Sequence, residues 1–255
     1  MPYVELNGED LFYASHDQDG SRNLIGIHGA GGDHGIWPGG MGNLPDCNTW
    51  LPDLPGHGRS GGPPRNRIAA YADVIEAFVT SLELDNVILA GHSMGGTIAL
   101  ALALRNPAWL QALILICTGA RPKVQPEVRE LIRTDFPAAA AHLAATGFSP
   151  GAAAALREEH KARVLSVDPA VYMADFDACD SIDVSARLAT IPQPALIISG
   201  DIDHMTPLKY SQFLEDHLPN ARLAVIAPAG HQLPREQPDD MVRIIRGFLL
   251  RSSGG

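Results

Sequence analysis

The chain has 255 residues, 45% of them hydrophobic, and a formal net charge of -10 at pH 7. This length and composition are typical of one globular domain with its own core, and the acidic balance argues against nucleic acid or an anionic membrane as a partner, since both require a basic face. The acidic N-terminal stretch and the three scattered cysteines predict neither a secretory signal, a disulfide framework nor a zinc cluster, so we expect a cytoplasmic protein without a bound metal.

Short apolar runs alternate with longer helical patterns along most of the chain. At the start, two such runs flank Asn7-Gly8, the pair that best supports a tight hairpin, so the first two strands are expected to be antiparallel. The later alternation predicts an α/β fold, with a mostly parallel central sheet and flanking helices. The predicted strands cover residues 3–6, 11–14, 24–27, 49–51, 87–90, 113–117, 195–199 and 223–226, and the predicted core helices cover 68–84, 97–105 and 239–250.

The alternation stops between residues 122 and 188. Two alanine-rich helical segments, 137–145 and 152–164, follow one another there without a strand pattern between them. Ordinary crossover helices are the alternative, but the segment is longer than a crossover requires. The pattern therefore predicts a helical cap over 122–188, inserted into a core formed by residues 1–121 and 189–255.

Residues 91–95 read Gly-His-Ser-Met-Gly and stand between the strand at 87–90 and a predicted helix. A Gly-x-Ser-x-Gly motif at such a junction holds the serine away from the sheet on a sharp, strained turn. The helix that follows directs free N–H groups and a partial positive charge toward the same place, where an oxyanion would form. Ser93 is therefore the candidate nucleophile.

A serine hydroxyl needs a base that takes its proton during the attack. Among the ten histidines, His231 follows the strand at 223–226 through an Ala-Pro-Ala-Gly loop, which leads toward the carboxyl ends of the strands, where open sheets bind ligands. The imidazole in turn needs a carboxylate that fixes its tautomer. Asp201 and Asp203 both follow the strand at 195–199, and the position of that strand alone leaves the choice between them open.

Together these motifs resemble the α/β-hydrolase fold family, in particular its serine esterases and lipases with a helical cap. Further support comes from His-Gly-Ala-Gly-Gly at 28–32 and Asp-Leu-Pro-Gly-His-Gly-Arg-Ser at 53–60, so the resemblance extends from about residue 24 to about residue 250. In this family the triad runs in the order nucleophile, acid, histidine, and the acid usually ends a Gly-x-x-Asp motif. Asp203, with Thr206-Pro207 beyond it, matches that motif, which favours it over Asp201.

The resemblance also implies an oxyanion hole, formed by the backbone N–H groups of Ala30 and Met94, and a reaction that needs no cofactor. Trp37 follows the first of these loops and is the candidate for a wall of the substrate pocket, with a place in the core as the alternative. His28 and His57 lie in the glycine-rich family motifs, where we expect them to brace loops by hydrogen bonding.

The expected reaction is the attack of Ser93 on a carboxylic ester, through an acyl-enzyme that water then cleaves. The partner is then a small-molecule ester, and the apolar cap favours a short to medium hydrophobic acyl group. The same triad would also serve the carbon–carbon hydrolysis of ring-cleavage products or a cofactor-free perhydrolase. An alternative of another class is a ligand-binding receptor of the hydrolase fold with little turnover.

Overall fold

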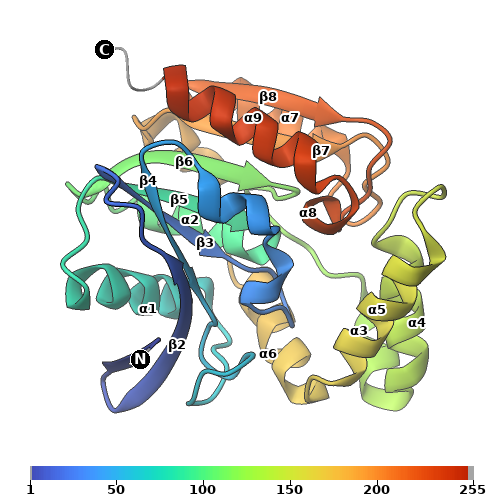
Figure 1. Ribbon diagram of the computed structural model, residues 1–255. Helices are drawn as coiled ribbons and strands as arrows, with labels where there is room; N and C mark the ends of the chain where they lie inside the picture. Colours follow the sequence, from blue (N-terminus) through green and yellow to red (C-terminus); the bar gives the residue numbers. More distant parts are fainter. Residues whose placement is uncertain (1, 252–255) are drawn as a thin grey trace.

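A mixed sheet is the centre of the computed structural model, which describes residues 2–251 with eight strands in the order β1-β2-β4-β3-β5-β6-β7-β8 (Figure 1). The β1/β2 and β2/β4 pairs are antiparallel and the remaining pairs are parallel. Both the mostly parallel sheet and its antiparallel start are thereby confirmed. The strands are β1 Tyr3–Leu6, β2 Glu9–His16, β3 Arg22–Ile27, β4 Cys47–Pro52, β5 Val87–His92, β6 Leu110–Ile116, β7 Ala195–Gly200 and β8 Ala221–Ile226.

Helices cover both faces of the sheet. Tyr71, Ile75 and Phe78 recur at three- and four-residue spacing and are fully buried, so one stripe of the first helix packs on the sheet. The helices α1 (Ile68–Ser81), α2 (Met94–Ala103) and α7 (Leu208–His217) contribute to the cluster on this face, and α9 (Pro238–Arg251) and the 3-10 turn η2 (Gly39–Asn43) to the cluster on the other. No described helix combines the length with the apolar composition that crossing a membrane requires.

Four helices lie between β6 and β7 and gather beside one end of the sheet, forming the predicted cap (Figure 1). They share a hydrophobic cluster of their own, which includes Val128, Leu143 and Phe176. The sequence pattern located α4 and α5 but not α3 and α6, and the division of the chain at residues 122 and 188 stays a prediction. The cap helices are α3 Pro126–Thr134, α4 Phe136–Thr146, α5 Ala154–Leu165 and α6 Pro169–Asp180; the remaining short elements are η1 His34–Ile36, η3 Ser185–Thr190 and α8 Leu233–Glu236.

Helix α2 begins at Met94, three residues before the predicted start at 97. The prediction was late because Gly95 and Gly96 are poor helix formers. Their lack of a side chain is what lets the helix approach the sheet: a Cβ on Gly95 would lie 2.1 Å from the carbonyl oxygen of Ile27. The close approach brings the first turn of α2 directly against the end of β3.

Replacing Gly95 by alanine is expected to lower the free energy of unfolding by about 3 kcal/mol or more, because the new methyl group meets backbone that cannot move aside. Gly39→Ala is the matched control, since a Cβ at that position has nothing within 4 Å, and it should change stability by about 0.5 kcal/mol or less. Urea denaturation of both variants checks the prediction. Equal stabilities would show that α2 does not need this close approach.

Candidate active site

Ser93 occupies the turn between β5 and α2, with φ 53° and ψ −118°. A positive φ is costly for a residue with a Cβ, and such strain is concentrated at functional sites. The Ser93 N–H donates to the carbonyl oxygen of Ile116 at 2.9 Å, and the Thr118 hydroxyl donates to the carbonyl oxygen of Ser93 at 2.7 Å. These hydrogen bonds to β6 and the residues after it hold the strained turn in place, and the serine lines a cavity.

His231 lies between Ser93 and an aspartate. Its Nε2 is 3.0 Å from the Ser93 Oγ, and its Nδ1 is 2.9 Å from the Asp203 Oδ2. The Nε2 of His92 donates to the carbonyl oxygen of His231 at 2.9 Å. Burial, together with the nearby His231, lowers the pKa of His92 to about 3, so His92 is a neutral support for the His231 backbone and not a second base.

Asp203 is held by its own loop. Its Oδ1 accepts hydrogen bonds from the amides of Met205 and Thr206, both at 2.8 Å, and its Oδ2 accepts one from the Thr206 hydroxyl at 2.6 Å. Burial raises the pKa of Asp203, but the charge and hydrogen bond of His231 and the bonds from Thr206 outweigh it and lower the pKa to about 2. The structure thus brings Asp203 to the histidine as a carboxylate. Asp201 is exposed and accepts a hydrogen bond from the Ala229 amide at 3.0 Å.

The lowered pKa of Asp203 makes stability depend on pH in the acid range. The carboxylate has a pKa of about 2 in the folded chain against an ordinary 3.8, so its ionised form stabilises the fold fully above pH 4 and progressively less as the pH falls to 2. The stability difference between the wild type and Asp203→Asn is therefore expected to shrink by on the order of 2 kcal/mol between pH 5 and pH 2. Urea denaturation at the two pH values measures it; a constant difference would contradict the lowered pKa.

The loop after β3 passes beside Ser93, because a Cβ placed on Gly29 would lie 3.1 Å from the Ser93 Cβ. Ala30, the next residue, lines the cavity. Met94 is the first residue of α2, and an amide in that position has no acceptor inside its own helix. Within residues 2–251, neither the Ala30 nor the Met94 amide has a hydrogen-bond acceptor. Two free N–H groups therefore stand near the serine, which is the arrangement that stabilises an oxyanion.

A cavity of about 240 Å³ lies above Ser93 and His231, and residues of the cap line its opposite side. The cap contributes apolar side chains and also the polar or charged side chains of Lys123, Gln125, His142, Thr146, His160 and Arg163. Burial, together with the nearby His231, lowers the pKa of His160 to about 4. His204 is exposed at the rim of the cavity. The apolar cap wall consists of Val128, Leu143, Val164, Tyr172 and Phe176.

Trp37 does not form a wall of this cavity, so that expectation is wrong. The side chain is only 6% exposed and belongs to the hydrophobic cluster on the α9 face of the sheet. The indole lies against β3 at Gly26, where a Cβ would come within 2.8 Å of its ring. The missing side chain at Gly26 thus leaves room for the indole on the sheet, while the preceding residue, Ile36, lines the cavity.

Asp175 of α6 is a site-related residue that the sequence analysis missed. Its carboxylate is fully buried and accepts hydrogen bonds from the loop that contains Ala30 and from the core. A signal for it was present in the sequence, because an aspartate there shares one helical face with Tyr172, Phe176 and Cys179. A charged residue in such an apolar stripe needs buried partners.

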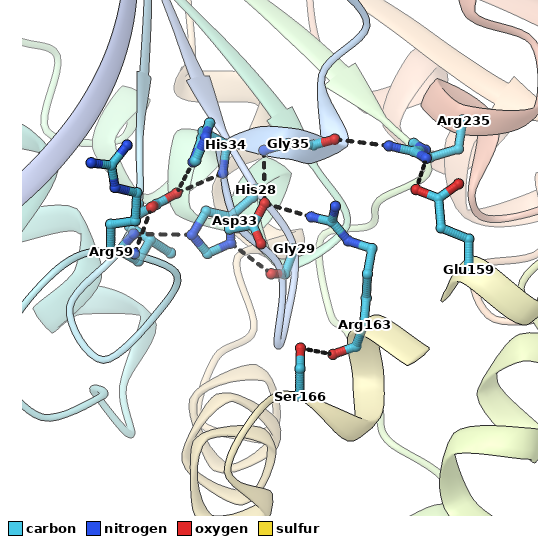
Figure 2. A network of polar contacts seen from close by, with 12 residues as sticks. His28, Gly29, Asp33, His34, Gly35, Arg59, Glu159, Arg163, Ser166 and Arg235 are labelled. Carbon is cyan, nitrogen blue, oxygen red and sulfur yellow. Dashed lines mark hydrogen bonds and ion pairs between the residues drawn. The ribbon is translucent and has the colours of Figure 1, made fainter. Parts of the chain in front are cut away.

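Two groups of potential metal ligands occur among residues 2–251. The first group consists of Cys117, Asp203 and His231, of which the last two form the hydrogen-bonded pair described above. The second group consists of Asp33, His34 and Asp53. In the second group the backbone amides of the surrounding loops already donate to both carboxylates. This second group orders the loop that precedes η1 (Figure 2).

Comparisons with known proteins agree with this geometry. A family model described as alpha/beta hydrolase fold matches residues 23–236. The pimeloyl-[acyl-carrier protein] methyl ester esterase of Serratia marcescens is 28% identical over 91% of this chain and 95% of its own length. The 2-hydroxymuconate semialdehyde hydrolase of Pseudomonas putida is 24% identical over 93% of this chain and 90% of its own length.

A solved structure of a thermophilic esterase from Thermogutta terrifontis is 25% identical, with a TM-score of 0.86, and covers 98% of this chain and 97% of that one. The family model covers the strands from β3 onward and the cap, and the relatives and the solved structure extend over most of the chain. The chain therefore belongs to the alpha/beta hydrolase fold family.

Proposed function

We propose that this protein is a serine esterase that cleaves carboxylic esters with short to medium hydrophobic acyl groups. The observation that carries the proposal is the continuous chain of contacts from Asp203 through His231 to Ser93, with distances of 2.9 Å and 3.0 Å. A hydroxyl, an imidazole and a carboxylate in this order are what nucleophilic attack by serine requires.

In the proposed reaction, the Ser93 Oγ forms a bond to the ester carbonyl carbon while His231 Nε2 takes the hydroxyl proton. The carbonyl π electrons move onto oxygen, and the amides of Ala30 and Met94 donate to this oxyanion. The oxyanion then collapses, the bond to the leaving alcohol breaks, and His231 returns the proton to that alcohol. Water repeats the same steps on the acyl-enzyme and releases the acid and free Ser93. Asp203 keeps the imidazole oriented and stabilises its charged form throughout.

The character of the cavity supports the assignment of the acyl group. Apolar side chains make up the larger part of its lining, although His142, Thr146 and His160 also face it from the cap, and its volume is about 240 Å³, which suits a small hydrophobic chain. The cations nearest to it already have partners, since Arg163 pairs with Asp33 and Lys123 with Asp180. A hydrophobic acyl chain therefore enters the cavity at a smaller cost in desolvation free energy than a charged one would.

Hydrolysis of a carbon–carbon bond in a ring-cleavage product is the second candidate. It is favoured by one observation, the similarity over 93% of the chain to a protein named 2-hydroxymuconate semialdehyde hydrolase. The same serine, histidine and aspartate would carry it.

The test combines a fluorophosphonate probe with substrate assays. We expect the probe to label Ser93, as mapped by peptide mass, and the protein to hydrolyse p-nitrophenyl acetate, butyrate and octanoate with turnover highest for the shorter chains. A ring-cleavage dienoate assayed in parallel decides between the two candidates. Absence of both labelling and turnover would overturn the esterase proposal and favour a ligand-binding receptor, and labelling at another serine would overturn the assignment of the nucleophile.

A further inference from the structure

The carboxylate of Asp175 joins the cap to the core at a buried point. It projects from α6 and accepts three hydrogen bonds: the Gly31 amide donates to Oδ2 at 2.8 Å, His57 Nε2 donates to the same oxygen at 2.8 Å, and the Tyr71 hydroxyl donates to Oδ1 at 2.6 Å. Asp175 and the His57 ring are both fully buried. Burying a carboxylate costs free energy unless hydrogen-bonding partners compensate for the lost water. The three donors around Asp175 provide this compensation.

Each ring nitrogen of His57 faces a buried oxygen. Its Nδ1 lies 3.0 Å from the carbonyl oxygen of Pro55 and its Nε2 faces the Asp175 carboxylate. A carbonyl oxygen and a carboxylate only accept hydrogen bonds, so this environment favours a ring with a hydrogen on both nitrogens. Burial lowers the pKa of His57, but the charge and hydrogen bond of Asp175 outweigh this and raise the pKa above its ordinary value. The contact between cap and core is therefore a buried Asp175–His57 pair with Tyr71 as a further donor.

The residue that Asp175 holds on the loop is the immediate neighbour of Ala30, whose amide is assigned above to the oxyanion hole. Gly31 has φ 61°, and its backbone comes so close to the cap that a Cβ there would overlap the Tyr172 ring at 2.0 Å. The direction of the Ala30 N–H therefore depends on how the Gly31 peptide is fixed, and its N–H is fixed by Asp175.

Further ties hold the continuation of this loop, as Figure 2 shows: Arg163 of the cap reaches Asp33, and Arg235 joins the carbonyl oxygen of Gly35 to Glu159 of the cap. These partners are half-exposed or exposed, and pairs in contact with water contribute little to stability. The fully buried contact at Asp175 is accordingly the one expected to dominate the geometry of the loop.

We propose that Asp175 is a positioning residue, which through the Gly31 amide sets the direction of the Ala30 N–H in the oxyanion hole and so makes catalysis depend on the seated cap. This inference rests on the esterase proposed above. It predicts a defect in stabilising the transition state and not in binding the ground state.

The test compares kcat and KM with the affinity for two inhibitors of equal chain length. A trifluoromethyl ketone accepts Ser93 at its carbonyl and forms a hemiketal oxyanion, whereas the corresponding methyl ketone reports ground-state binding. For Asp175→Ala we expect kcat to fall about 100-fold, similar to the loss of one oxyanion donor, with KM and methyl ketone affinity within about twofold and trifluoromethyl ketone affinity reduced in parallel with kcat. The kcat of Asp175→Asn should be about tenfold higher than that of Asp175→Ala, since the amide oxygen of asparagine can still accept a hydrogen bond from Gly31.

Asp177→Asn is the matched control, because Asp177 lies on the same helix in an exposed pair with Arg129, and it should leave all four quantities unchanged. Where neither Asp175 variant folds, Tyr71→Phe removes one donor from the carboxylate, and kcat and trifluoromethyl ketone affinity should both fall two- to fivefold.

Folded Asp175 variants with a wild-type kcat, or a fall in kcat without loss of trifluoromethyl ketone affinity, would overturn the positioning role and leave the esterase proposal standing. Absence of turnover in the wild type would count against both.

Discussion

Replacing Ser93 by alanine is expected to lower kcat for p-nitrophenyl butyrate by about 10⁴- to 10⁶-fold, the range seen when a triad nucleophile is removed. His231 then has no hydroxyl to deprotonate, and the residual rate comes from a water molecule that attacks the bound ester. KM should change little, because the cap wall proposed to bind the acyl group is untouched. Initial rates over a range of substrate concentrations, with fluorophosphonate labelling in parallel, measure the effect.

The control for Ser93→Ala is Ser166→Ala, which removes an exposed hydroxyl whose hydrogen bond stays within the end of α5. It should retain wild-type kcat and fluorophosphonate labelling. Circular dichroism should show that both variants are folded. A folded Ser93→Ala protein with more than a tenth of the wild-type kcat would rule out Ser93 as the nucleophile.

Replacing Asp203 by asparagine is expected to lower kcat by about 10⁴-fold at neutral pH, the size of effect that follows when the carboxylate of a triad is lost. An amide cannot stabilise the imidazolium that forms as Ser93 attacks, and its N–H₂ group favours the wrong tautomer of His231. The measurement is the pH profile of kcat/KM between pH 5 and pH 10.

Asp201→Asn provides the matched comparison, since that carboxylate is exposed and its hydrogen bond goes to the Ala229 amide. We expect its kcat within about twofold of the wild type. A reversed order, with the larger loss at position 201, would show that the acid has been assigned to the wrong aspartate.

Much of the fold could be predicted because hydrophobic periodicity is a local property. The strand at Val87–His92 and the helix at Ile68–Ser81 could be predicted from the spacing of apolar residues within each segment. The start of α2 was predicted too late because helix propensity disfavours glycine, and the reason for Gly95 is a contact with the backbone of Ile27, 68 positions earlier in the chain. A tertiary contact of that kind overrides propensity and leaves no local pattern.

The candidate site divides in the same way. Ser93 directly follows β5, and His231 follows β8 after a four-residue loop; both strands end at the same edge of the parallel sheet, so the shared edge could be predicted from the topology. The direction of the Trp37 side chain could not be predicted from the neighbouring residues, because a side chain after a loop can turn to either side. The space left by Gly26 on the sheet determines this direction. Asp175 was passed over because its partners, His57 and Tyr71, are more than 100 positions away.

The insertion of the cap between β6 and β7 has a consequence for how such proteins diversify. These two strands are neighbours in the sheet, so the chain leaves and re-enters the core at adjacent points, and an exchange of the inserted segment leaves the pairing of the strands intact. A different inserted segment on the same core would then give a different substrate pocket. The proposed role of Asp175 sets a condition on that exchange: the new segment must also supply a buried acceptor for the Gly31 amide. Without such an acceptor, the loop that contains Ala30 would lose its fixed position.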